Sequence, residues 1–126
     1  MRIVSTKFHG LLDYLISLSL LSYPLIWGFE SPDYQISAAT GFGIGLYSIF
    51  TKYEAGLVKK ISMHSHMMFD ACAGIFLVLS PVVLNFRNES AIFYIVTGTV
   101  LLLYTALTDS RTYFRRYVLH PNNYNF

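Results

Sequence analysis

The sequence predicts an all-α membrane protein: a bundle of four transmembrane helices built from two tandem, parallel helical hairpins. Three observations carry this prediction, namely the composition, four long apolar segments and an internal repeat. Of the 126 residues, 54% are hydrophobic and only 13% are charged, which is about half the charge of an ordinary soluble domain. This balance favours lipid as the surrounding medium. The length allows one domain, which we assign to residues 1–126.

Four apolar segments are each close to the ~20 residues that a helix needs to cross ~30 Å of hydrocarbon. They cover residues 8–29, 36–53, 64–86 and 90–109. The second is the weakest, since GFGIGLYSIF contains three glycines, although glycine is common where membrane helices pack closely. Backbone polar groups in lipid must be satisfied within the segment, so we expect helices. The first segment resembles a signal peptide, but its length and Asp13 favour a retained helix.

The chain repeats itself at an offset of 57 residues. The recurring features are the pairs His9/His66, Asp13/Asp70, Pro24/Pro81, Phe29/Phe86, Thr40-Gly41/Thr97-Gly98, Tyr47/Tyr104 and Thr51/Thr108. A gapless repeat of this length predicts a duplicated hairpin, with repeat 1 over residues 5–54 and repeat 2 over residues 62–111. Both copies then enter the membrane in the same direction, which predicts a pseudo-twofold axis along the membrane normal. The basic and aromatic tail, residues 112–126, suits the lipid headgroup region.

The distribution of basic residues predicts the orientation. Eight of the nine lie before the first segment, between the second and third, or after the fourth: Arg2, Lys7, Lys52, Lys59, Lys60, Arg111, Arg115 and Arg116. The other two connections hold only Arg87. Basic residues accumulate on the cytoplasmic side, so we expect both termini in the cytoplasm.

Helical spacing gathers the repeated polar residues on inward faces at similar depth, near the cytoplasmic end. This predicted polar layer contains His9, Asp13, Tyr47, Thr51, His66, Asp70, Tyr104 and Thr108. Ionisable groups inside a membrane are costly unless paired or hydrated, so their presence requires an explanation. We expect Pro24 and Pro81 to mark kinks or packing points, and Gly41 and Gly98 to allow close helix contact.

Three interpretations of this layer remain open. In the first, it is a hydrogen-bonded packing network that sets helix order, and no cofactor is bound. In the second, His9, His66, Asp13 and Asp70 hold Zn²⁺, Mn²⁺ or iron, or the two histidines hold a haem axially. In the third, the layer belongs to a proton or ion path, which would need an oligomer to be complete.

The sequence does not support other classes of protein function. It contains no nucleophilic triad or nucleotide loop, so we assign no catalytic residue and lean away from an enzyme. The basic residues are spread along the membrane edge, which argues against nucleic-acid binding. The single cysteine, Cys72, lies in an apolar stretch and is expected to be a buried small hydrophobe.

Ser80-Pro81-Val82, in the first helix of a two-helix repeat, resembles the Ser-Pro-Trp signature of the SPW-repeat family of small bacterial membrane proteins. The first copy reads Ser22-Tyr23-Pro24-Leu25 with Trp27 displaced, and STKFHGLLDYLISL is similar to the opening of four-span members. The resemblance covers nearly the whole chain and implies a bacterial inner-membrane protein, without implying an activity. We therefore expect a structural or accessory protein whose partners are the bilayer and a homo-oligomer or larger membrane complex.

Overall fold

A computed structural model describes residues 3–86 and 88–111, and the regular elements of this part of the chain are four α-helices. They are α1 (Thr6–Trp27), α2 (Asp33–Ile49), α3 (Met63–Leu84) and α4 (Asn88–Leu107). The predicted tail and the basic residues Arg2, Arg87, Arg115 and Arg116 lie outside the described residues.

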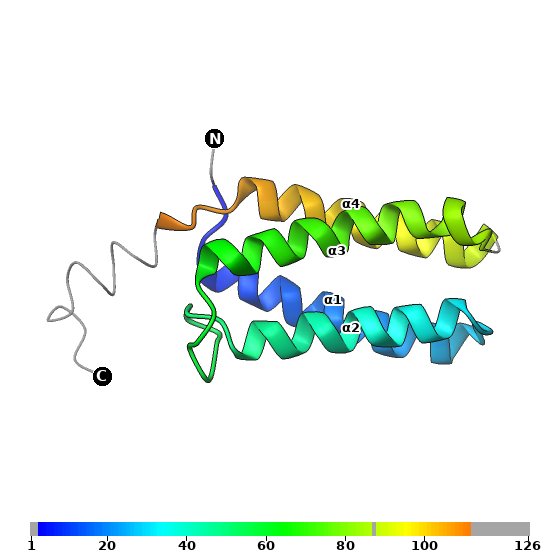
Figure 1. The fold of residues 1–126 in the computed structure, drawn as a ribbon, viewed down its shortest axis with the longest axis horizontal. Coiled ribbons are helices and arrows are strands. Elements are labelled where there is room, and N and C mark those ends of the chain that lie inside the picture. The colour runs from blue at the N-terminus through cyan, green and yellow to red at the C-terminus, as the bar shows by residue number, and fades with distance from the viewer. Residues whose placement is uncertain (1–2, 87, 112–126) are drawn as a thin grey trace, which may run out of the picture.

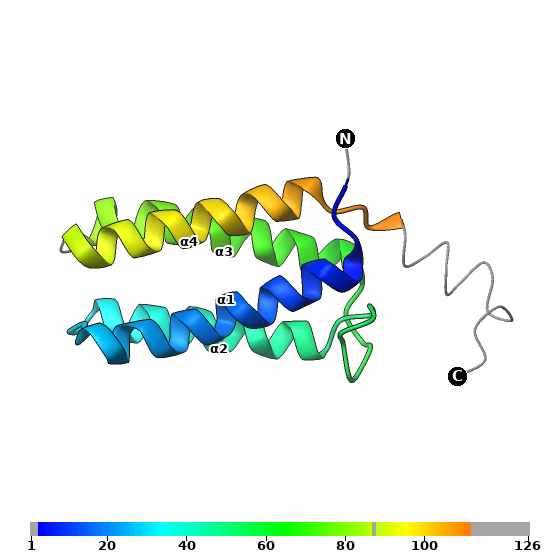
Figure 2. The same cartoon turned by 180° about the vertical axis from the view of Figure 1, so that it is seen from behind.

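The helices form an elongated bundle of two antiparallel pairs (Figure 1). α1 packs along α2 and α3 packs along α4, while smaller contacts of α1 with α4 and of α2 with α3 join the two pairs. The start of α1, the α2–α3 connection and the end of α4 lie at one end, which we call the long-loop end (Figures 1 and 2). The turns that follow α1 and α3 lie at the opposite, short-turn end.

Local capping sets the bounds of α1 and α3. Each begins after a serine whose side chain accepts a backbone N–H of the first turn, Ser5 for α1 and Ser62 for α3. Each ends at a residue in the left-handed conformation, Gly28 and Asn85 respectively, as helix C-termini commonly do. With these caps, α1 covers residues 6–27 and α3 covers residues 63–84. Both helices begin and end slightly earlier than the predicted apolar segments.

Three helices are long and apolar enough to cross a membrane: α1, α3 and α4. α2 has 17 residues, which corresponds to about 25 Å of helix and is the short extreme for a span. It ends at Ile49, four residues before the predicted segment does. The chain leaves the helix there because Phe50 and Lys52 bond to the segment that leads into α3, through the bonds from Ile61 N–H to Phe50 O and from Lys52 N–H to Ile61 O.

The buried face of each helix points toward the bundle axis, and the outer faces carry large apolar side chains. Leu20, Leu77 and Leu101 are fully buried on the axis, whereas Ile26 and Val82 are 71% and 79% exposed. An apolar exterior over long apolar helices matches a lipid environment. Cys72 lies on this exterior, so the expectation that it is buried was wrong: it occupies a helix position that faces away from the bundle axis.

Candidate functional site

Four ionisable side chains from α1 and α3 meet near the long-loop end, and none of them is exposed. His9 and Asp13 lie one turn apart on α1, and His66 and Asp70 lie one turn apart on α3, a spacing that puts both members of a pair on one helix face. The bundle turns these two faces toward each other. The His9 and His66 Nε2 atoms are 3.2 Å apart.

Two threonines determine which ring nitrogen of each histidine carries a proton. Thr51 Oγ1 donates its hydrogen to the Tyr47 carbonyl at 2.7 Å, so at its 2.8 Å contact with His66 Nδ1 it can only accept. Thr108 is arranged in the same way between the Tyr104 carbonyl and His9 Nδ1. Both Nδ1 atoms are therefore protonated, so a ring that is neutral has its Nε2 lone pair directed inward.

Backbone contacts at the long-loop end hold both threonines in place. Thr51 forms a parallel bridge with Ile61, which precedes α3, and Thr108 forms one with Val4, which precedes α1. Each threonine is thus fixed by the segment leading into the helix whose histidine it contacts. The members of the two bridges differ by 57 positions.

Two tyrosines orient the carboxylates. The Tyr47 hydroxyl donates to Asp70 Oδ1 at 2.5 Å, and the Tyr104 hydroxyl donates to Asp13 Oδ1 at 2.6 Å. In both residues this leaves Oδ2 directed at the histidines. The His9 Nε2 to Asp70 Oδ2 and His66 Nε2 to Asp13 Oδ2 distances are both 2.9 Å. The distances within α1 and within α3 are 3.5 Å and 3.1 Å.

When both rings are neutral, the four inner atoms of this tetrad all direct lone pairs toward one another. These atoms are His9 Nε2, His66 Nε2, Asp13 Oδ2 and Asp70 Oδ2. Such an arrangement is repulsive unless positive charge, either protons or a metal ion, lies between them. Four ligands bound tetrahedrally at 2.0–2.1 Å lie about 3.3 Å apart. Five of the six distances among the inner atoms run from 2.9 to 3.5 Å, and the candidate ligand atoms all lie within 4.8 Å of one another. These are the ligand types that Zn²⁺ takes, and the threonines and tyrosines supply the outer contacts typical of metal sites.

The same geometry does not suit a haem. Two axial imidazoles would place their nitrogens about 4 Å apart on opposite faces of a porphyrin, because each Fe–N bond is close to 2 Å. Here the two Nε2 atoms are 3.2 Å apart and the Asp13 and Asp70 carboxylates lie beside them. No porphyrin plane fits between these groups.

The structure brings together all eight residues of the predicted polar layer, and it adds one that the sequence did not single out. Tyr53, in the α2–α3 connection, is fully buried and its ring centroid lies 5.4 Å from that of His66. Burial, with a further contribution from the Asp13 charge, raises the pKa of Tyr53 well above its ordinary value. The ring is therefore neutral and covers this side of the tetrad. Tyr53 has no repeated partner, since Ser110 occupies the corresponding position, so the repeat gave no signal for it.

An apolar layer follows the tetrad toward the short-turn end. Leu20 and Leu77 lie about two turns beyond Asp13 and Asp70, and with Ile44 and Leu101 they are at most 1% exposed. The nearby serine hydroxyls are engaged by backbone carbonyls, as in the bond from Ser17 to Gly41 O. This layer interrupts any polar route along the described part of the bundle, which argues against the proton-path interpretation.

A model described as the SPW repeat domain matches residues 7–108. The chain belongs to the SPW repeat family. No curated protein and no solved structure matches the chain.

The structure gives a physical reason for the Ser-Pro pair of the SPW repeat. Pro81 has no N–H, so the Leu77 carbonyl one turn earlier lacks its helical donor. The Ser80 hydroxyl donates to that carbonyl at 3.1 Å. In the first copy Tyr23 occupies the serine position, and the Leu20 carbonyl freed by Pro24 instead accepts from Ser37 of α2 at 2.6 Å. Each proline thus leaves one backbone carbonyl without its helical donor, and a serine hydroxyl of the same helix or of the neighbouring helix bonds to that carbonyl.

The two repeated glycines of the SPW repeats lie where helices approach closely. A Cβ atom added at Gly41 would be 2.8 Å from Leu20 Cβ, and one added at Gly98 would be 2.9 Å from Leu77 Cβ. Both distances are too short for a side chain, so α2 approaches α1, and α4 approaches α3, at these positions.

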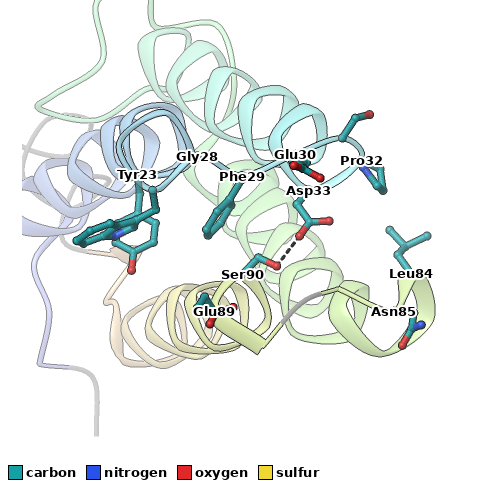
Figure 3. A pocket seen from close by; sticks show the side chains of 12 residues that line it. Tyr23, Gly28, Phe29, Glu30, Pro32, Asp33, Leu84, Asn85, Glu89 and Ser90 are labelled. Carbon is teal, nitrogen blue, oxygen red and sulfur yellow. Dashed lines mark hydrogen bonds between the residues drawn. The ribbon is translucent and has the colours of Figure 1, made fainter.

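A second polar cluster, which sequence reasoning missed, lies at the short-turn end beside a cavity of about 580 Å³ (Figure 3). The Ser90 hydroxyl donates to the Asp33 carboxylate, and the Tyr94 hydroxyl donates to the Asp33 carbonyl. Tyr23, Trp27 and Phe29 form the aromatic wall of the cavity. Asp33 and Ser90 are 57 positions apart, but their chemical types differ, so a search for identical repeated residues passes over them. This cluster ties α2 to α4.

Proposed function

We propose that this SPW repeat protein is a small bacterial inner-membrane protein that holds one divalent transition-metal ion between its two helix pairs. Zn²⁺ is the ion that we propose first. His9, His66, Asp13 and Asp70 would be the ligands. The observation that carries the proposal is the pair of threonine contacts, because they occupy Nδ1 of both imidazoles and leave both Nε2 atoms free to act as ligands beside two carboxylate oxygens. The candidate ligand atoms all lie within 4.8 Å of one another.

Charge supports a divalent ion. Two carboxylates and two neutral imidazoles carry a charge of −2, so a divalent cation makes the fully buried site neutral, as a low-dielectric interior requires. Four protein ligands complete a tetrahedron and leave no open position for water, which is the pattern of structural rather than catalytic zinc sites. The ion would therefore join the helix pairs and stabilise the bundle, in keeping with a structural or accessory role.

The competing interpretation is a metal-free network. The His9–Asp70 and His66–Asp13 distances of 2.9 Å also suit hydrogen bonds, and two protons would neutralise the tetrad as well as a divalent ion does. The layer would then set helix order only. Metal content separates the two interpretations, because both predict that the tetrad stabilises the fold.

The test is elemental analysis of the full-length protein, purified without chelator in detergent and then titrated with Zn²⁺. We expect about one equivalent of tightly bound metal, no Soret band, and loss of that metal in the His9→Ala/His66→Ala variant. His64→Ala is the matched control, since His64 is an exposed imidazole two residues from His66, and it should keep the metal. A folded protein that binds no Zn²⁺, Mn²⁺ or iron would contradict the proposal and leave the metal-free network.

We further infer four spans in two duplicated hairpins, with both termini in the cytoplasm. α2 is short but pairs with α1 along its length, and the caps, bridges and tetrad contacts recur at an offset of 57 residues. Lys52, Lys59 and Lys60 lie in the α2–α3 connection, and this placement supports a cytoplasmic long-loop end.

Cysteine labelling in intact cells tests this topology. In a Cys72→Ser background, Ser31→Cys at the short-turn end should react with an impermeant maleimide from outside. Leu57→Cys, at the long-loop end, should react only after the membrane is permeabilised. The opposite pattern would reverse the orientation, and labelling of both sites from outside would contradict four spans.

A further inference from the structure

The cavity of about 580 Å³ at the short-turn end is lined by three carboxylates. They are Glu30 from the α1–α2 turn, Asp33 from the start of α2 and Glu89 from the start of α4 (Figure 3). Among the described residues of its walls, none is a lysine, arginine or histidine. We call this space the acidic cavity. Its negative charge comes from both helix pairs, at the end of the bundle opposite the tetrad.

Helix capping explains the position of only two of these carboxylates. Asp33 and Glu89 lie in the first turns of α2 and α4, where the helix dipole favours an acidic side chain. Glu30 belongs to neither helix. Neither Glu30 nor Glu89 pairs with a basic side chain in the described part of the chain. Like charges that face one space repel each other, and this favours a cation between them.

Asp33 is the buried member of the three, with 8% exposure. One of its carboxylate oxygens accepts a hydrogen bond from the Ser90 hydroxyl. The other points away from Ser90 in Figure 3 and accepts no hydrogen bond from the described residues. This oxygen is therefore available to a molecule in the acidic cavity.

Another wall of the acidic cavity is aromatic and held in place by ring contacts. Tyr23 stacks on Phe93 with ring centroids 4.2 Å apart, and its centroid lies 5.6 Å from that of Trp27 and 5.7 Å from that of Phe29. Figure 3 places the Phe29 ring between Tyr23 and Asp33. Aromatic faces attract cations, so a cation beside Phe29 has a ring on one side and a carboxylate on the other.

This arrangement suits an organic cation better than a metal ion. A metal ion gathers its ligand atoms within a few ångströms of one another. In the described part of the chain, only the tetrad brings three or more histidine, cysteine, aspartate or glutamate side chains together with ligand atoms within 4.8 Å. The three carboxylates of the acidic cavity are more widely spaced. A volume of about 580 Å³ also lies in the range of small-molecule sites.

We propose that the acidic cavity binds an organic ammonium group, with Asp33 and Glu89 as counter-charges and the Phe29 ring against its alkyl substituents. The ammonium can belong to a phospholipid headgroup or to a free amine. Two exposed apolar side chains, Trp27 and Leu84, border the cavity, which puts it beside lipid in the proposed topology. The tetrad takes no part, so this inference is independent of the metal proposal.

The experiment uses the fluorescence of Trp27, which is the single tryptophan of the chain and lines the acidic cavity. Full-length protein in detergent is titrated with choline and with 3,3-dimethylbutan-1-ol, an uncharged molecule of the same shape. Both titrations contain about 0.5 M NaCl, which screens charges that are not in contact. We expect saturable binding of choline and binding of the alcohol that is weaker by about tenfold or more.

Two variants remove the counter-charges one at a time. Asp33→Asn retains an acceptor for Ser90 and should weaken choline binding about tenfold or more. Glu89→Gln changes an exposed side chain and should weaken it about 2- to 5-fold. The matched control is Asp109→Asn, which removes a carboxylate at the long-loop end and should leave choline binding unchanged.

Equal binding of choline and the alcohol would overturn the proposal. So would Asp33→Asn and Glu89→Gln variants that bind choline as Asp109→Asn does. If Asp33→Asn does not fold by circular dichroism, Glu89→Gln decides, because its side chain is exposed. The chain itself contains one competing cation, Arg87, which precedes α4 in the sequence. Choline binding that tightens by more than about tenfold in Arg87→Gln would assign the acidic cavity to that guanidinium and would also overturn the proposal.

Lipid added to the same micelles distinguishes the two sources of the ammonium group. Phosphatidylethanolamine and diacylglycerol are compared, because only the first carries an ammonium. Competition with choline by phosphatidylethanolamine alone assigns the acidic cavity to a lipid headgroup. Choline binding that neither lipid affects assigns it to a free amine.

Discussion

The imidazole rings of His9 and His66 meet edge to face on the bundle axis, with their Nε2 atoms 3.2 Å apart and their Nδ1 atoms turned outward to Thr108 and Thr51. Each ring comes from one helix pair and is oriented by a threonine near the end of a helix in the other. Together with its threonine and tyrosine partners, the tetrad thereby connects α1 to α4 and α3 to α2, two pairings with few contacts of their own. Loss of the tetrad should therefore separate the helix pairs before it unfolds either one.

The threonines give the first prediction. Thr51→Val or Thr108→Val removes the acceptor of a histidine Nδ1–H, so the proton is free to move to Nε2 and block the ligand atom. Zn²⁺ affinity should fall about 10- to 100-fold, as for other outer contacts of metal ligands. Competition with a chromophoric chelator measures this. Thr51→Ser and Thr108→Ser retain the oxygen and should stay near wild type, and an equal loss in the serine variants would show that packing of the methyl group is responsible.

The second prediction concerns the tyrosines. Tyr47→Phe and Tyr104→Phe each remove the donor to a carboxylate Oδ1 and let that carboxylate rotate. Each should weaken Zn²⁺ binding about tenfold or more and to a similar extent, because the two bonds, 2.5 Å and 2.6 Å, are equivalent. Tyr34→Phe is a control at an exposed position of α2. Strongly unequal effects of Tyr47→Phe and Tyr104→Phe would contradict an equal contribution of both halves to the site.

Much of this arrangement follows from the sequence alone. The helical class follows from composition, the family from the residues around Ser80-Pro81, and the set of polar-layer residues from repeat spacing combined with helical periodicity. His9 and Asp13 share a face on any helix, so their proximity needs no tertiary information. Family membership and the three long apolar helices agree with the sequence expectations.

The remainder depends on how the bundle assembles. The partner of His9 Nδ1 is 99 residues away in the sequence. Helical spacing therefore does not predict the histidine tautomer on which the metal proposal rests. Tyr53 and Asp33 are each replaced by a serine at the equivalent position of the second repeat, so a method based on identical repeated residues does not find them. The apolar segment continues to residue 53, but α2 ends four residues earlier, at Ile49. The reason is that Phe50 makes a backbone hydrogen bond with Ile61, which composition alone does not indicate.

The prolines give the third prediction, a double-mutant cycle. Ser37→Ala leaves the Leu20 carbonyl without its 2.6 Å donor, and a buried unpaired acceptor costs about 1–3 kcal/mol of the free energy of unfolding. In a Pro24→Ala background the new backbone N–H can serve that carbonyl, so Ser37→Ala should cost less there. Denaturant titration in detergent measures both values. Identical costs in the two backgrounds would show that Pro24 is not the reason for the Ser37 contact.

The last prediction tests the buried ring that covers the tetrad. Gly10→Ala places a methyl group where the Tyr53 ring lies, 2.1 Å from Cε2, and overpacking of this kind typically costs about 1–3 kcal/mol. The melting temperature should fall, and metal exchange with chelator should accelerate because the displaced ring no longer covers His66. Gly43→Ala is the control, since an added Cβ atom there meets nothing within 4 Å and alanine favours the helix.

In a Tyr53→Ala background, Gly10→Ala should lose most of its cost in stability, because the clash is with that ring. If Gly10→Ala is equally destabilising with and without Tyr53, the close approach of Ala55 Cβ at 2.7 Å is the dominant contact, and the α2–α3 connection rather than the Tyr53 ring closes this side of the site.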